Sequence, residues 1–311
     1  MLVFVTGAAG FIGTAVVKEL LAHGHKVLGL SRSAANAEKL KALGAEIHEG
    51  SLDDSESLSA GAAKADGVIH LAFKHDFENF VANCELDWRV IEALGKPLVG
   101  TGKPFIVTNG TLPIAKKPGV ADWDVPVTED VVLPPLAEGE HPLRRKSEDL
   151  ALAFAKQGVR SAIVRLPPTV HGDGDQAFVP LIIAKSREKG FVGTIGDGKN
   201  VWATVHRDDA AVVFRLALES GTAGGIHHGI AEEGVPVSSI LDSIARQLGV
   251  EKRPVKPEDF GDYGVLPLFL PLQNPVSSKK TQELLGWKPK RVGLIEDLES
   301  DAYDVATAKS W

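Results

Sequence analysis

The amino-acid sequence predicts an α/β fold, and three neighbouring features at its amino terminus lead to that prediction. A short apolar run over residues 2–5 is long enough for a buried parallel strand. A glycine-rich segment follows over 6–13, and residues 14–23 then have the apolar spacing of a helix. Gly24 ends this helix, and a second apolar run over 26–30 completes a strand–helix–strand unit.

The composition excludes several other classes of protein. The 311 residues are 44% hydrophobic and 24% charged, which is typical of a soluble globular protein with one large domain or a domain and a lobe. The single cysteine, Cys84, excludes an internal disulfide and a zinc site built on several thiolates. A run of about 18 uncharged apolar residues is missing, so we expect no membrane span and a cytoplasmic location. The net charge of −7 argues against nucleic acid as a partner.

The glycines of the segment over 6–13 have the spacing of a dinucleotide-binding turn. Gly7 permits a tight turn, Gly10 lets the backbone approach a pyrophosphate, and Gly13 allows close packing of the helix on the strand. The amino terminus of the following helix adds free N–H groups and a partial positive charge. We therefore expect a dinucleotide here, and the alternative is a tight turn in some other α/β protein. The other residues expected in contact with it are Ala9, Phe11 and Ile12.

The end of the second strand indicates which dinucleotide is bound. An acidic residue there would bond the ribose hydroxyls and favour NAD, but this chain has Ser31, Arg32 and Ser33. Arg32 can pair with a 2′-phosphate and stack on adenine, and the two serines can bond phosphate oxygens. We therefore expect NADP(H) as the cofactor. The alternative is that Arg32 is a solvated residue at the start of a loop.

Further segments along the chain resemble, in order, those of the extended and atypical short-chain dehydrogenase/reductases, which include the NAD-dependent epimerase/dehydratase group. The resemblance spans almost the whole chain, and the ordered set is far more specific than any one segment. Besides the glycine spacing, the segments are Gly50–Asp53, Val68–Ala72, Phe105–Thr111, Val164–Gly172, Val205–Ala210 and Leu285–Pro289.

This resemblance implies a Rossmann-type doubly wound parallel sheet with a smaller, discontinuous substrate-binding lobe. It places the dinucleotide-binding domain in 1–172, completed by 205–227, the lobe in 173–204 and 228–290, and a carboxy-terminal helix or tail in 291–311. It also implies further cofactor contacts, from Ser51, Leu52, Leu71, Ala72, Phe73, Thr108, Pro167 and Val170.

The sequence departs from the family pattern at the Tyr-x-x-x-Lys motif on which the family's chemistry usually rests. The chain has only two tyrosines, Tyr263 and Tyr303, and neither has a lysine four residues later. Counting back from Val164 puts Arg144 at the lysine position, with Lys146 as the competing candidate, and Glu140 at the tyrosine position. Arg144 can bond the nicotinamide ribose and hold positive charge there, but it cannot release a proton as a general acid.

Several residues are candidates to assist the substrate oxygen in place of the tyrosine. Gly110 stands at the usual serine position, so Asn109 or Thr111 could bond a carbonyl oxygen, or they could merely satisfy the strand end. His141 is our first candidate for the proton donor, because imidazole titrates near neutrality. The other candidates are Glu140, His75, His171, Lys74 and a relay through bound water.

The sequence favours an NADPH-dependent carbonyl reductase that acts on a small ketone or aldehyde. The alternatives are a sugar-nucleotide epimerase or dehydratase, and a non-catalytic NADP(H)-binding regulator. Apolar residues of the predicted lobe favour a hydrophobic substrate; they are Phe178, Phe191, Trp202, Leu266, Phe269 and Leu270. We expect no metal site. The helices predicted over 78–94 and 143–157 match the dimer seam of the family, but the stripe of Phe80, Cys84, Trp88 and Ile91 could equally pack on the sheet, so a monomer and a homodimer both stay open.

Overall fold

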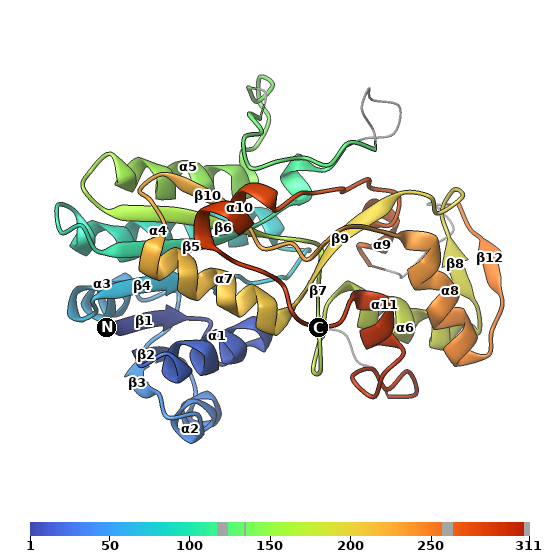
Figure 1. Ribbon diagram of the computed structural model, residues 1–311, viewed down its shortest axis with the longest axis horizontal. Coiled ribbons are helices and arrows are strands. Elements are labelled where there is room, and N and C mark those ends of the chain that lie inside the picture. Colours follow the sequence, from blue (N-terminus) through green and yellow to red (C-terminus); the bar gives the residue numbers. More distant parts are fainter. Residues whose placement is uncertain (117–123, 134, 257–263, 308–311) are drawn as a thin grey trace.

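The computed structural model, described for residues 1–116, 124–133, 135–256 and 264–307, confirms the α/β fold with a doubly wound parallel sheet (Figure 1). Each pair of neighbouring strands in the main sheet is parallel. The order reverses between β1 and β4, so a ligand is expected at the carboxyl ends of these strands. Across the sheet the strands are β10 (Gly225–His228), β6 (Arg160–Leu166), β5 (Pro104–Gly110), β4 (Gly67–His70), β1 (Leu2–Thr6), β2 (Lys26–Ser31) and β3 (Glu46–Glu49).

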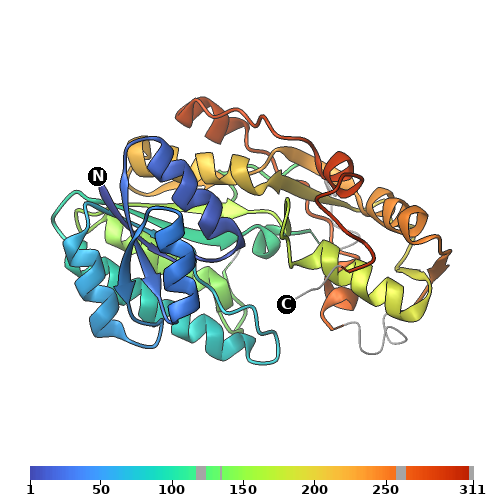
Figure 2. The same cartoon turned by 90° about the horizontal axis from the view of Figure 1, so that it is seen from below.

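Helices cover both faces of this sheet, and each face buries its own apolar core (Figure 2). On one face lie α1 (Phe11–Ala22), α2 (Ala34–Ala42) and α7 (Arg207–Ser220). On the other face lie α3 (Ser55–Lys64), α4 (Phe80–Gly95) and α5 (Leu143–Ala155). Two short 3₁₀ turns, η1 (Lys96–Leu98) and η2 (Leu112–Ile114), flank β5. Inner strands such as β1 and β5 are buried on both sides, which explains their apolar runs, whereas the edge strand β3 is polar and partly exposed.

A smaller lobe with a separate core lies beside the carboxyl ends of the main strands (Figure 1). Its core is built on a three-stranded sheet, and its other strand pair is parallel. The strands are β11 (Glu232–Pro236), β9 (Val201–His206) and β7 (Thr169–His171) in the first sheet, and β12 (Lys252–Pro254) and β8 (Val192–Thr194) in the second. The helices are α6 (Phe178–Lys189), α8 (Val237–Leu248), α9 (Leu266–Phe269) and α11 (Leu294–Leu298).

The first strand–helix–strand unit forms where the sequence predicts it, with small differences at its boundaries. Helix α1 begins at Phe11 instead of residue 14, because Gly10 is its N-cap in an extended conformation. The helix ends at Ala22, and Gly24 reverses the chain with a φ of +78°, which a glycine adopts without strain. The apolar run after residue 67 is a strand only as far as His70, so Leu71 and Ala72 already belong to the loop at the carboxyl edge.

The last quarter of the chain contributes to both cores. Trp287 is 1% exposed and packs with Leu285 in the core beneath α1 and α7, whereas Leu294 and Leu298 pack in the core of the lobe. Helix α10 (Lys279–Leu285) accordingly contacts α7 and β10. The domain boundaries given above stay a prediction. Within the described ranges, no helix is long and apolar enough to cross a membrane.

Candidate functional site

The glycine-rich turn has the geometry that a closely approaching phosphate requires. Gly7 has a φ of +70°, and a Cβ on it would lie 2.8 Å from the Ala72 nitrogen. A Cβ on Gly13 would lie 2.0 Å from the Gly7 carbonyl oxygen, so helix α1 packs directly on the turn. Gly10 is the N-cap without a capping side chain, and the first-turn N–H groups of an α-helix have no partner inside the helix. The turn therefore presents unhindered backbone donors at a positive helix end.

A cavity of about 430 Å³ opens at the carboxyl ends of β2 and β3. Its lining includes Ser31, Arg32 and Ser33, and Gly50 and Ser51 from the loop after β3. These are five of the positions at which the sequence predicts contacts with the adenosine half of the cofactor or the loop that holds it. The Ser33 hydroxyl also accepts from the Asn36 N–H and thereby caps α2.

The sequence reasoning missed a basic residue that contacts the glycine turn. Lys39 of α2 reaches back across the fold, and its ammonium donates to the Ala9 carbonyl at 2.9 Å. This places a second cation, besides Arg32, between the cavity and the glycine turn. The signal in the sequence was a lysine in the predicted region directly after Arg32. The cradle without Cβ atoms at the glycine turn fits the phosphates of a dinucleotide.

At the other end of the expected cofactor site, Arg144 is held at four points. Its guanidinium pairs with Asp87 at 3.1 Å, donates to the Thr108 carbonyl at 2.6 Å and to the Asn109 side chain at 3.1 Å, and lies 4.1 Å from the centre of the Phe73 ring. Lys146 instead lies over the Trp88 ring on the outer side of α4. The geometry therefore brings Arg144, and not Lys146, to the ends of β4 and β5.

The polar groups of Asn109 and Thr111 are already bonded within the protein. The Asn109 amide donates to Glu148 at 2.8 Å, and its oxygen accepts from Arg144. The Thr111 hydroxyl is fully buried and donates to the Asn274 side chain at 2.7 Å. These contacts favour the second reading of both residues, in which they satisfy the end of the strand.

The candidate proton donors lie in different environments. His141 stacks on Trp88 with ring centres 5.3 Å apart, and its Nδ1 accepts from the Leu143 N–H. The Glu140 carboxylate accepts from the Ala137 N–H. His75 contacts the Phe73 ring edge-on, and the residue as a whole is exposed. Partial desolvation of its imidazole by the surrounding protein, together with the Arg144 charge, lowers the pKa of His75 to about 4.

Two further candidates are bound elsewhere. Lys74 pairs with Asp53 at 3.3 Å on the surface. His171 is fully buried and pairs with Asp297 of α11 at 2.7 Å. Tyr303 lies in the lobe and donates to Asp175 at 2.7 Å, whereas Tyr263 lies outside the described residues.

The remaining expected cofactor residues line the same edge of the sheet. The Leu71 N–H donates to the Thr6 carbonyl, and Ala72 meets Gly7, so the β4 loop closes against the glycine turn. The Thr108 hydroxyl is buried without a hydrogen-bond partner, as expected of a group that bonds an absent ligand. Val170 is buried in the core on the α1 and α7 face, and Pro167 is also buried.

Comparison with known proteins assigns this geometry to a family. A model of the NAD-dependent epimerase/dehydratase family matches residues 3–230. The chain belongs to this family. Its enzymes are oxidoreductases and epimerases that work with NAD(P), and the glycine turn and strand order above are those that its fold requires.

Relatives of this epimerase/dehydratase-family protein cover most of its length. It is 47% identical over 304 residues to an uncharacterized protein of Schizosaccharomyces pombe, covering 97% of this chain and 100% of that one. It is 27% identical to a 2-alkyl-3-oxoalkanoate reductase of Stenotrophomonas maltophilia, covering 81% and 77% of the two chains. A dTDP-glucose 4,6-dehydratase from Streptomyces venezuelae has the same fold, with a TM-score of 0.74 at 21% identity over 96% of this chain and 94% of that one.

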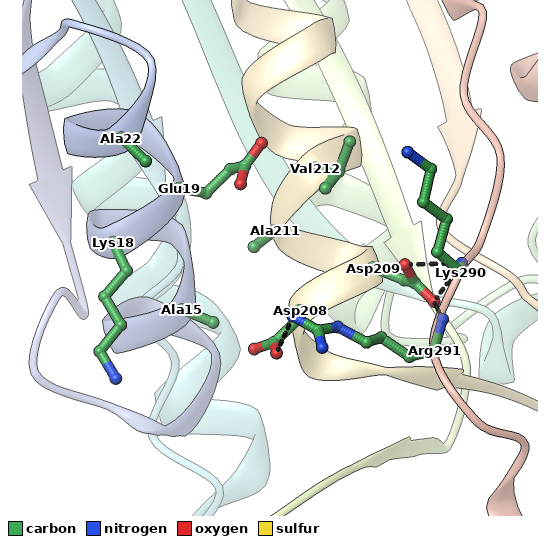
Figure 3. A pocket seen from close by; sticks show the side chains of 10 residues that line it. All are labelled: Ala15, Lys18, Glu19, Ala22, Asp208, Asp209, Ala211, Val212, Lys290 and Arg291. Atoms are coloured by element: carbon green, nitrogen blue, oxygen red, sulfur yellow. Dashed lines mark hydrogen bonds and ion pairs between the residues drawn. The ribbon is translucent and has the colours of Figure 1, made fainter.

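The protein has a second cavity, which lies apart from the proposed dinucleotide site. A groove of about 470 Å³ runs between α1, α7 and the segment around Lys290 (Figure 3). The Asp209 carboxylate at its end accepts from the main-chain N–H groups of Lys290 and Arg291, and the Arg291 guanidinium pairs with Asp208 at 3.0 Å. None of the residues expected to bind the dinucleotide lines it. Its charged groups tie the carboxy-terminal segment to α7.

The sequence reasoning missed a chain of buried polar residues that links the strand ends. Glu148 accepts two hydrogen bonds from Arg165, at 2.8 and 2.7 Å, besides the one from Asn109. His70 and Asp87 form a second buried pair, with 3.0 Å between Nε2 and Oδ1. Among the described residues, no group of three or more His, Cys, Asp or Glu is arranged to hold a metal ion.

Proposed function

We propose that this protein is an NADPH-dependent carbonyl reductase that transfers a hydride to a small hydrophobic ketone or aldehyde. The observations that carry the cofactor preference are Arg32, which lines the cavity after β2 together with the acidic Glu49 and Asp54, and the Lys39 ammonium, which lies at the Ala9 carbonyl of the glycine turn. An acidic residue at that strand end would repel a 2′-phosphate, whereas two cations attract it. Its location in the cytoplasm, and its state as a monomer or a homodimer, stay predictions from the sequence.

Aromatic side chains support a hydrophobic substrate, and Phe269 is the one among them that the sequence also indicated. Phe178, Trp202, Leu266 and Leu270 are buried in the core of the lobe. The segment after β4 instead contributes aromatic rings that cross to the lobe: Phe73 contacts Phe80, Phe80 stacks on Phe77, and Phe77 meets Phe269. This row runs from the ring beneath Arg144 to the lobe and favours an apolar or aromatic group on the substrate.

Different residues of the site have different roles in carbonyl reduction. When bound, the reduced nicotinamide supplies the hydride, which adds to the carbonyl carbon and leaves negative charge on the oxygen. The fixed guanidinium of Arg144 stabilises negative charge that develops near it, because it stays charged and its position is set by four contacts. The oxygen then takes a proton from His141, His75 or water, and these donors are tested separately below.

The experiment that tests the cofactor preference is a fluorescence titration of NADPH and NADH against four proteins: wild type, Arg32→Ala, Lys39→Ala and the control Arg89→Ala, an exposed residue of α4. We expect the first two variants each to weaken NADPH binding about tenfold or more, the loss of one charge-assisted hydrogen bond, with NADH binding unchanged. Equal affinity of the wild type for the two cofactors would refute the preference.

Turnover is tested by NADPH oxidation against a panel of ketones, aldehydes and nucleotide sugars. We expect reduction of apolar ketones or aldehydes. Turnover of nucleotide sugars alone would favour the epimerase or dehydratase alternative. Tight NADPH binding without turnover of any compound would favour the non-catalytic regulator.

A further inference from the structure

A single buried carboxylate, that of Asp87 in α4, contacts both halves of the proposed cofactor site. The residue is 4% exposed. Its Oδ1 accepts from His70 Nε2 at 3.0 Å. Its Oδ2 pairs with Arg144 at 3.1 Å and accepts from the Ser147 hydroxyl. Burial alone raises the pKa of Asp87, but the Arg144 charge and the hydrogen bonds of His70 and Ser147 outweigh it and hold the pKa below its usual range, so the group is ionised.

The first arm of this carboxylate, the path from Oδ1 through His70 to Thr6, leads to the glycine turn. Because an ionised carboxylate only accepts, His70 must carry a hydrogen on Nε2. In the neutral imidazole, Nδ1 is then an acceptor, and it lies 2.6 Å from the Thr6 hydroxyl. With a neutral His70, that hydroxyl donates to Nδ1, and its oxygen accepts from the Ala72 N–H, 3.4 Å away. Thr6 precedes Gly7, which Ala72 touches, so this arm fixes the contact between the turn and the β4 loop.

The second arm, the ion pair between Oδ2 and Arg144, leads to the Arg144 guanidinium at the ends of β4 and β5. Arg144 follows Leu143, whose φ of +45° is the only positive φ of a non-glycine residue in the described part of the chain. The Trp88 indole N–H donates to the Leu143 carbonyl at 3.1 Å and holds this conformation. A non-glycine residue in the left-handed region costs about 1–3 kcal/mol, and this conformation persists only where the surrounding structure fixes it. The fold therefore imposes strain to start α5 in the direction that brings Arg144 to Asp87.

We propose that Asp87 is a positioning residue for this site, which holds Arg144 at the strand ends and sets the His70 tautomer that orients Thr6 in the dinucleotide turn. The inference rests on the proposed function for the identity of the ligand. An amide of the same shape cannot replace the carboxylate, because its oxygen can face His70 or Arg144 but not both. Its NH₂ group would then oppose the guanidinium, or force His70 to move its hydrogen from Nε2 to Nδ1.

The tautomer can be measured in the wild-type protein without any substitution. The ¹⁵N chemical shifts of the His70 ring, assigned by their loss in His70→Asn, should report a hydrogen on Nε2 and none on Nδ1, with and without NADPH. A hydrogen on Nδ1 in the wild type would overturn the inference. This measurement does not depend on the folding of any Asp87 variant.

The substitution Asp87→Asn should weaken NADPH binding at least about tenfold, the usual effect of losing a hydrogen bond to a charged group, and should change the His70 ring shifts. Glu92→Gln is the matched control, because it makes the same change from carboxylate to amide on α4 at a surface side chain that pairs with Lys96, and we expect its NADPH affinity within about threefold of wild type. In an Arg144→Gln background, Asp87→Asn should lose the part of its effect on affinity that acts through Arg144, since that arm is already gone.

The outcomes separate this inference from the proposed function. If wild type does not bind NADPH, the proposed function fails. If wild type binds NADPH, and Asp87→Asn is folded and binds it equally well with unchanged His70 shifts, Asp87 is not a positioning residue and the proposed function stands. An equal effect of Asp87→Asn in the wild-type and Arg144→Gln backgrounds would show that Asp87 does not act through Arg144.

Discussion

The substitution Gly7→Ala isolates the close approach on which the dinucleotide turn depends. A left-handed conformation costs an alanine about 1–2 kcal/mol, and Gly7 has a φ of +70°. The added Cβ would also lie 2.8 Å from the Ala72 nitrogen and 3.0 Å from its Cα, so the turn and the β4 loop must separate by several tenths of an ångström. Such overpacking costs about 1–3 kcal/mol. The free energy of unfolding should therefore fall by about 2–5 kcal/mol, and NADPH binding should be lost.

Gly24→Ala is the matched control for this prediction. Gly24 has a φ of +78°, and nothing lies within 4 Å of its added Cβ. The control should thus lose only the conformational part, about 1–2 kcal/mol, and keep its NADPH affinity. Urea unfolding of both variants in parallel gives the two free energies, and NADPH fluorescence gives the affinities. Equal unfolding midpoints for the two variants, or unchanged NADPH binding in Gly7→Ala, would contradict the reasoning.

Three further substitutions test the buried polar groups. Burial raises the folded-state pKa of Asp175 from 3.8 to about 6, so the free energy of unfolding falls by about 3 kcal/mol as pH rises between these values, at about 1.4 kcal/mol per pKa unit. In urea unfolding, Asp175→Asn should therefore become more stable relative to wild type from pH 4 to pH 7. A constant difference between the two proteins would contradict this. Thr111→Val leaves the Asn274 oxygen without its donor and should cost about 1–3 kcal/mol with NADPH affinity unchanged; lost turnover at unchanged stability would instead give Thr111 a role toward substrate. Arg165→Met leaves Glu148 buried and unpaired, and should cost about 3–5 kcal/mol, most of which Glu148→Gln in the same chain should restore.

The parts of the fold that the sequence predicts well are those set by neighbouring residues. The turn over 6–13 depends on glycines three residues apart, and the backbone at Gly7 and the packing at Gly13 follow from the missing side chains. Strand ends are less well predicted, because the register with a partner decides where pairing stops. The run after residue 67 stays apolar to Ala72, yet its pairing with β1 ends at His70.

The polar network could not be read from spacing, because its partners are far apart in the chain. Thr111 and Asn274 are separated by 163 residues, and Asp87 and Ser147 by 60. One signal was nevertheless present: Asp87 shares the buried side of α4 with Cys84 and Ile91, at helical spacings of three and four residues. A carboxylate on a buried stripe needs charged or hydrogen-bonding partners, so this spacing was a signal that Asp87 has such a partner, and the sequence reasoning missed it. Trp88, another residue of the predicted stripe, donates its indole N–H to the Leu143 carbonyl at the start of α5.

An arginine at the lysine position changes what a pH profile can report about the reaction. The charge of Arg144 does not titrate in the working range, so any change of rate with pH comes from the proton donor. If the imidazolium of His75 donates the proton, its pKa of about 4 makes the rate fall about tenfold for each pH unit from 5 to 8. A turnover rate at saturating NADPH that is constant from pH 5 to 8 would therefore exclude the His75 imidazolium. If His141→Asn also leaves that constant rate unchanged, water becomes the donor that the profile favours, and the fixed charge of Arg144 must then stabilise the oxyanion until water protonates it.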